Sequence, residues 1–168
     1  DWQRLINQTA QLTALKGLFV AQSALGAKTE NLAALFELTL PLIGQVTQAD
    51  GGHKSRMPDV HLKLMRNLIE IRNTASSFDV KGTAQLDKKI VQMAALCRMW
   101  RHADGQFARF NGAGLMPNEI IEETLARADQ RGKVLQLAPD SGFVRLSSAR
   151  STLIMDTGTP ETDAVVTG

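Results

Sequence analysis

Residues 86–100, Leu-Asp-Lys-Lys-Ile-Val-Gln-Met-Ala-Ala-Leu-Cys-Arg-Met-Trp, carry the clearest structural pattern in the chain. Their core-forming residues recur every three or four positions and are Leu86, Ile90, Met93, Cys97 and Trp100. This period places them along one side of an α-helix, as in a helix that packs against a core. The stretch therefore predicts a helix with one buried face.

Three more helices are predicted before this one. The first is expected to close at Gly26, since glycine is common directly after the C-terminus of a helix. The second begins at Thr29, a good N-cap residue, and should kink or end near Leu40 because Pro41 cannot continue a helix. The third begins at Pro58, since proline suits the first turn of a helix. We expect four helices joined by short loops, apart from the longer loop that precedes Pro58.

After Trp100 the pattern changes from helical to extended. A short amphipathic helix is expected over residues 118–128. Branched and aromatic residues that alternate with polar ones then predict two strands, over 142–147 and 151–156, with 148–150 as their connection. The two strands are expected to pair in antiparallel fashion.

The order of these elements predicts the domain organisation. Helices followed by strands, rather than strands that alternate with helices, indicate two separate layers or domains and an α+β fold class. We therefore predict a helical part over residues 1–103 and a β part over residues 104–168.

Composition narrows the class of protein. The 168 residues are 43% hydrophobic and 21% charged, as in ordinary globular domains, so disorder is excluded. No apolar run approaches the ~18 residues of a membrane span, and no signal peptide opens the chain. The chain begins at Asp1 rather than Met and stops at Gly168 without a capping signal, so we expect an internal fragment of a longer protein.

Charge and cysteine content argue against nucleic-acid and metal sites. Residues 1–110 carry 14 Lys and Arg against 9 Asp and Glu, a mild excess that suits an anionic ligand. No basic cluster with interleaved aromatic residues marks a nucleic-acid surface. The single cysteine, Cys97, excludes an internal disulfide and a thiolate zinc site, and no cofactor is expected.

The segment most informative for function is Asp50-Gly51-Gly52-His53-Lys54-Ser55-Arg56-Met57-Pro58-Asp59-Val60-His61. Its two glycines allow a sharp turn, while His53, Arg56 and His61 gather hydrogen-bonding groups on one loop between helices. His61 falls in the first turn of a helix, where the dipole disfavours imidazolium and keeps the neutral ring available as a base. The alternative is that the glycines form only a turn and that His61 is a partly buried helix residue.

Arg101 and His102 form a second candidate group directly after the last of the four helices. A basic pair is also favourable at a helix C-terminus for structural reasons alone, and this alternative stays open. The glycine-rich residues 111–114 lack the Gly-Lys-Ser/Thr ending of a phosphate loop, so a nucleotide site is not expected.

Four motifs follow one another over most of the chain: Asp50-Gly51-Gly52-His53-x-Ser55-Arg56-x-Pro58, Arg101-His102-x-Asp104-Gly105-x-Phe107-Ala108-x-Phe110-Asn111-Gly112, Ser141-Gly142-Phe143-x-Arg145-Leu146 and Asp156-x-Gly158-x-Pro160. Their content and order resemble those of heparinase II/III-like proteins, especially the alphaproteobacterial branch of that bacterial family. The resemblance implies an α+β multidomain fragment that holds the C-terminal helices of an (α/α) toroid and the first strands of an antiparallel β-sandwich.

The resemblance also implies an activity. Members of that family with known activity are polysaccharide lyases, which perform β-elimination on glycans that contain uronic acids, such as glycosaminoglycans. His61 matches a histidine of the family's Tyr-His pair and is expected to be catalytic. We expect His53, Arg56, Arg101 and His102 to bind the acidic polysaccharide where the toroid meets the sandwich. A periplasmic location is implied by the same resemblance.

One departure from the family favours a rival hypothesis. Val60 stands where active relatives carry tyrosine, and the chain has no tyrosine elsewhere. The rival is a non-catalytic homologue that binds acidic glycans or acts as a scaffold on the same fold. A third hypothesis, a helical protein-interaction module, leaves the second half of the chain unexplained.

Overall fold

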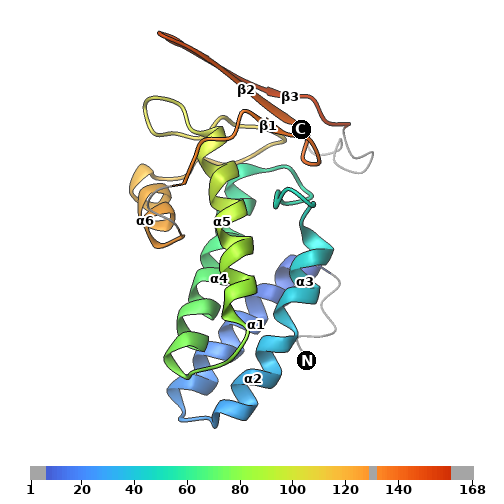
Figure 1. Ribbon diagram of the computed structural model, residues 1–168, viewed down its shortest axis with the longest axis vertical. Helices are drawn as coiled ribbons and strands as arrows, with labels where there is room; N and C mark the ends of the chain where they lie inside the picture. Colours follow the sequence, from blue (N-terminus) through green and yellow to red (C-terminus); the bar gives the residue numbers. More distant parts are fainter. Residues whose placement is uncertain (1–6, 129–131, 160–168) are drawn as a thin grey trace.

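A computed structural model of the chain describes residues 7–128 and 132–159 and shows a helical body with a small sheet at one end (Figure 1). The helices are α1 (Gln8–Ala24), α2 (Thr29–Glu37), α3 (Thr39–Val46), α4 (Pro58–Ser77), α5 (Thr83–Trp100) and α6 (Asn118–Ala128). The strands are β1 (Leu137–Ala138), β2 (Phe143–Ser148) and β3 (Ser151–Asp156).

The helix predicted from residues 86–100 is confirmed as α5, and its apolar stripe is buried. The four predicted helical regions correspond to α1, α2, α4 and α5, and the helix expected over 118–128 is α6. The second predicted helix ends close to Leu40 as expected, because α2 stops at Glu37 and Pro41 does not lie within it. Pro41 lies in the first turn of a separate helix, α3, where a proline costs no backbone hydrogen bond.

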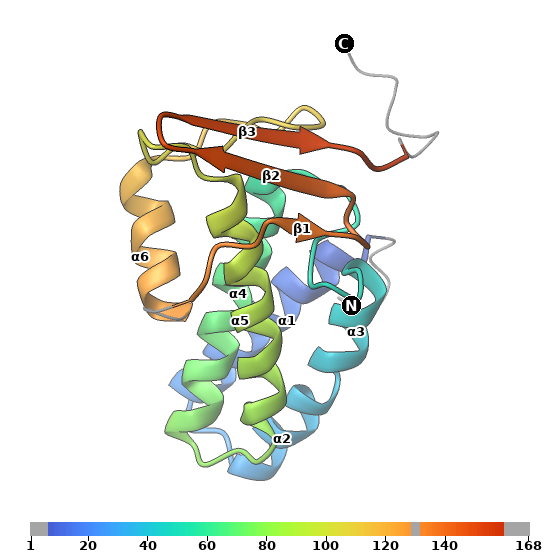
Figure 2. The ribbon, with the colours of Figure 1, turned by 45° about the horizontal axis from the view of Figure 1, so that its top comes forward.

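The helices share one hydrophobic core. Helix α4 packs against both α1 and α5, α2 and α3 cover α1, and α6 lies against α4 and α5. Figures 1 and 2 show α1, α4 and α5 side by side through the body of the molecule. Trp100, at the end of α5, is buried. It packs both against the helices and against the sheet, so that the hydrophobic core continues from one to the other. Its ring makes edge contacts with those of His61, Phe107 and Phe143.

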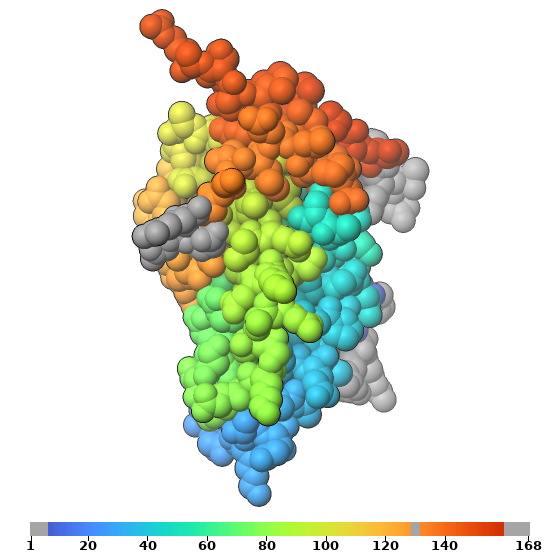
Figure 3. Space-filling model, in the orientation of Figure 1, coloured from blue at the N-terminus to red at the C-terminus, as the bar shows by residue number. Residues whose placement is uncertain are grey.

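The three strands form one antiparallel sheet in the order β1-β2-β3. The expected hairpin is confirmed, and its turn consists of two residues, Ala149 and Arg150. The strands spread across one end of the helical body in Figure 2, and in Figure 3 the hairpin extends beyond it. Phe143 of β2 is buried with its ring centroid 5.2 Å from that of Trp100, and this contact fixes the sheet on the helices.

The prediction of a toroid followed by a β-sandwich is wrong. Residues 7–128 form helices packed around one core, without the ring of helix pairs that defines a toroid. Residues 132–159 add a single three-stranded layer, and no second sheet covers it in the part of the chain that is described. The apolar stripes of the predicted helices are buried within this compact bundle. The division near residue 103 stays a prediction, with α6 beyond it packed back onto α4 and α5.

Within residues 7–128 and 132–159, none of the helices combines the length and the apolar character needed to span a bilayer. The same residues hold no group of three or more His, Cys, Asp or Glu side chains placed to bind a metal ion.

Candidate functional site

His61 lies completely buried between the loop that precedes α4 and the last turns of α5. The backbone N–H of His53 donates to its Nδ1 at 3.2 Å, so the ring proton is on Nε2. Nε2 then donates to the carbonyl oxygen of Met93, which lies 3.0 Å away. The ring is also 4.9 Å from that of Trp100, measured between centroids. Both nitrogens are occupied by the chain itself, and His61 joins the loop to α5.

His53 is also buried and connects the same loop to α1. Its Nε2 lies 3.0 Å from Oγ1 of Thr9. Its Nδ1 accepts from the backbone N–H of Ser55 at 3.0 Å and lies 2.8 Å from Oγ of the same residue. These bonds close the turn after Gly52 and engage both nitrogens of the ring.

Burial sets the charge state of both rings. Desolvation lowers the pKa of His53 from 6.5 to about 4 and that of His61 from 6.5 to about 4, because water no longer stabilises the imidazolium. The carbonyl of Met93 opposes the shift of His61 without cancelling it. Both rings are neutral at pH 7, and the main cause is burial rather than the helix dipole from which the neutral state of His61 was predicted.

Arg56 links the loop that precedes α4 to the end of the sheet opposite the hairpin turn. Its Nε donates to the carbonyl of Ser141 at 3.2 Å and its Nη1 to the carbonyl of Thr159 at 2.8 Å. Nη2 forms an ion pair with Asp156, and the guanidinium lies over the ring of Phe143. The residue is 8% exposed. The carboxylate that pairs with this guanidinium therefore belongs to the chain itself.

Asp50 makes a second link between the loop and the sheet. One carboxylate oxygen accepts from the backbone N–H of Ser141 at 2.7 Å, and the other from its hydroxyl at 2.5 Å. Gly52 permits this close approach, because a Cβ at that position would collide with the hydroxyl of Ser141. We call the group formed by Asp50, Gly52, Arg56, Ser141 and Asp156 the loop–sheet junction.

Three of the quoted motifs meet at the loop–sheet junction. Asn111, from the second motif, joins them by donating to the carbonyl of Arg56 at 3.1 Å and to Asp156 at 3.0 Å. The residue types that suggested ligand binding thus have a structural role here. Contacts of His53, Arg56 or His61 with a substrate stay a prediction.

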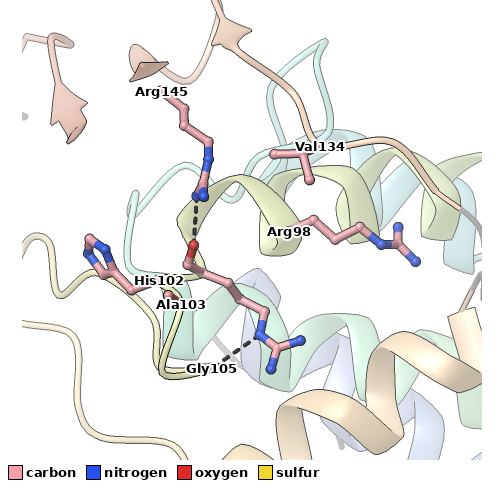
Figure 4. A pocket seen from close by; sticks show the side chains of 7 residues that line it. Arg98, His102, Ala103, Gly105, Val134 and Arg145 are labelled. Atoms are coloured by element: carbon pink, nitrogen blue, oxygen red, sulfur yellow. Dashed lines mark hydrogen bonds between the residues drawn. The ribbon is translucent and has the colours of Figure 1, made fainter. Parts of the chain in front are cut away.

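Arg101 and His102 lie apart from this junction, in a hollow of about 320 Å³ beside α5 (Figure 4). Arg101 donates from Nε to the carbonyl of Gly105 at 3.0 Å and pairs with Glu122 of α6 at 3.2 Å. Arg145 of β2 donates from Nη1 to the carbonyls of Met99 and Arg101, at 2.7 and 2.6 Å. The hollow is lined by Arg98, Arg101, His102, Ala103, Gly105, Val134 and Arg145.

The outer face of the sheet is apolar and exposed. Directly paired residues of an antiparallel sheet lie on the same face, and the pairs Leu137–Val144, Val144–Met155 and Leu146–Leu153 share the face turned away from the helices. Leu137, Leu146 and Leu153 are each more than half exposed. We call the set Leu137, Val144, Leu146, Leu153 and Met155 the outer sheet face.

Sequence reasoning missed two of these features. Arg145 was part of a motif but not a candidate for binding, because its position beside Arg101 depends on how β2 docks. The outer sheet face was hidden as well. Alternation predicts that one face of a strand is apolar, but here Phe143 makes the inner face apolar too, so the sequence alone does not show which face is covered.

Comparison with known proteins gives a limited match. The chain is 24% identical to "FtsZ-localized protein C" of Caulobacter vibrioides over 127 residues, which is 76% of this chain. The chain spans about a fifth of the length of that curated relative, 22%. No family model matches the chain. No solved structure matches it.

These findings overturn the expected kinship with heparinase II/III-like proteins. The named relative is a protein that localises with FtsZ, and its name mentions neither a lyase nor a glycan. The predicted polysaccharide lyase, and the glycan-binding or scaffold homologue on the same fold, are therefore both wrong. The motifs that suggested the family are accounted for largely by the loop–sheet junction.

Proposed function

We propose that this chain is a protein-interaction module that acts at FtsZ. The observation that carries the proposal is the outer sheet face, a group of apolar side chains from three strands that lie next to one another on the surface. Contiguous exposed apolar surface of this kind is typical of protein–protein interfaces.

Two further observations support a binding role. The similarity to "FtsZ-localized protein C" favours FtsZ, or a complex that contains FtsZ, as the partner. His61, predicted to be catalytic, and His53 and Arg56, predicted to bind a substrate, all bond to other parts of the chain, and these bonds support a structural role for them. The helical body then serves as a rigid support for the sheet.

Replacement of Leu153 by Asp should weaken binding to FtsZ by ~10-fold or more, because a charge in the centre of an apolar interface must be desolvated without a partner. The affinity of this chain for purified FtsZ from the organism that encodes the chain can be measured by biolayer interferometry. Leu153 is 51% exposed in the hairpin, so the variant should fold normally, as circular dichroism would verify.

Val20→Asp is the matched control, because Val20 is 41% exposed and lies on α1 rather than in the sheet. It should leave the affinity unchanged. Equal losses in both variants would exclude the outer sheet face as the binding surface, and no binding by the unmodified chain would exclude FtsZ as a direct partner.

A further inference from the structure

A basic groove runs beneath the hairpin, on the opposite side of the sheet from the outer sheet face. The hollow beside α5 adjoins a second one of about 570 Å³, and the two share His102 and Ala103. The second hollow continues to the tip of the hairpin and is lined there by residues 148–152. We call the two together the hairpin groove. Its size exceeds what a single small anion would fill.

The charges that line the hairpin groove are mostly positive. Arg101 and Arg145 lie at one end and Arg150 at the other, and Asp104 is the one carboxylate among the lining residues. Arg145 bonds to two carbonyl oxygens, and no carboxylate in residues 7–128 or 132–159 forms an ion pair with it. The ion pair of Arg101 is with Glu122, a side chain that is 67% exposed and therefore weakly held.

An open strand edge lies beside the same groove. Strand β1 pairs only with Phe143 and Val144, and the bond from the N–H of Arg145 to the carbonyl of Gln136 is the last on that side. Beyond it β2 continues to Ser148 with no strand beside it in the described part of the chain. An unpaired edge offers backbone donors and acceptors to an extended segment of another protein.

We propose that the hairpin groove binds an extended acidic segment of a protein partner. Carboxylates of the segment pair with Arg145 and Arg101, since the guanidinium fork donates two parallel hydrogen bonds to a carboxylate. The backbone of the segment lies along the open edge of β2, and a further carboxylate reaches Arg150. This inference rests on the proposed function, because it gives the chemistry of a segment that belongs to a protein partner.

The test uses a fluorescein-labelled octapeptide of alternating Glu and Val, with a peptide in which Gln replaces Glu as the neutral comparison. Binding to the 168-residue chain is measured by fluorescence polarisation. Arg150→Glu reverses a charge in the exposed turn of the hairpin and leaves the fold contacts of Arg145 in place. It should weaken binding of the acidic peptide roughly tenfold, as loss of a charged hydrogen bond does, and the Gln peptide should bind at least as weakly.

Lys88→Glu is the matched control, because Lys88 is an exposed cation on α5 outside the groove. It should leave the affinity for the acidic peptide unchanged. An equal loss in both variants would mean diffuse attraction to a basic surface and would overturn the proposal, as would failure of the acidic peptide to bind.

Two further measurements distinguish a peptide site from a site for a single oxyanion, and the hairpin groove from the proposed FtsZ-binding surface. Displacement of the peptide by millimolar inorganic phosphate, but not by chloride at equal ionic strength, would identify a site for a single oxyanion and overturn the proposal. Leu153→Asp, which is designed to weaken FtsZ binding, should leave peptide binding intact. Peptide binding that persists when the chain fails to bind FtsZ would therefore refute the proposed partner while retaining the groove.

Discussion

Acidification from pH 7 to pH 4 should destabilise this chain steeply. His53 and His61 have a pKa of about 4 in the folded protein, while an exposed histidine has a pKa of about 6.5. Between pH 6.5 and pH 4 the unfolded chain binds more protons at these histidines than the folded chain does. The stability that their neutral, buried state provides is therefore present above pH 6.5 and is lost as the pH falls towards 4. In this window each ring should lower the free energy of unfolding by about 1 kcal/mol for each unit by which the pH falls.

Urea unfolding followed by tryptophan fluorescence at a series of pH values measures this dependence. His53→Gln should be less stable at pH 7 but should show a flatter profile, because one of the two titrating rings is gone. His102→Gln is the control, since His102 is exposed, and its profile should follow that of the unmodified chain. A stability that is constant between pH 6.5 and 4.5 would contradict the buried, neutral state of the two rings.

Arg56→Ala should lower the free energy of unfolding by about 3–5 kcal/mol, the usual cost of removing one partner from a buried ion pair. The substitution leaves Asp156 without its cation and removes the donors to the carbonyls of Ser141 and Thr159. The same urea titration at pH 7 measures the change. Amide hydrogens of β2 and β3 should also exchange faster, because Arg56 is a main link between the sheet and the helical body.

Arg66→Ala provides the comparison for this variant. The side chain of Arg66 is 39% exposed, and its Nη2 lies 3.9 Å from Oε2 of Glu123. Such an exposed pair contributes at most about 1 kcal/mol to the free energy of unfolding. The control should therefore have nearly the same free energy of unfolding as the unmodified chain. If Arg56→Ala and Arg66→Ala lost similar amounts of stability, the loop–sheet junction would not hold the two parts together.

The helical part of the fold could be predicted from local sequence because its signals lie within single elements. The apolar period of residues 86–100 and the proline at the start of α4 each act over a few residues. Pro41 correctly indicated the end of the second helix, but α3 was not predicted, since a proline that marks the end of one helix can also stand in the first turn of the next. Strand β1 has two residues, too few to produce a periodic pattern.

The loop–sheet junction could not be predicted in the same way. Arg56 bonds to Ser141 and Thr159, which follow it by 85 and 103 residues. No periodic pattern joins positions so far apart, and Asp156 was therefore not identified from the sequence as the partner of Arg56. A motif rich in Arg, His and Gly indicates specific hydrogen bonds and close backbone approaches. Such a motif alone does not show whether these contacts bind a ligand or stabilise the fold.

The exposed surfaces were the least predictable part of the candidate site. Burial depends on which elements cover a residue, and the outer sheet face is apolar in sequence but uncovered in the described structure. The hairpin groove depends on the way the hairpin overhangs residues 102–104, which are distant from it in sequence. Both surfaces became visible only with the tertiary arrangement.

Hydrogen–deuterium exchange of this chain, measured with and without saturating FtsZ, tests the central claim most directly, since one experiment reports both binding and its location. We expect FtsZ to slow exchange in the hairpin, residues 143–156, while the middle of α1 and α4 exchanges as in the free chain. Slower exchange confined to the helices, or identical exchange with and without FtsZ, would contradict an interaction module that binds FtsZ through its sheet.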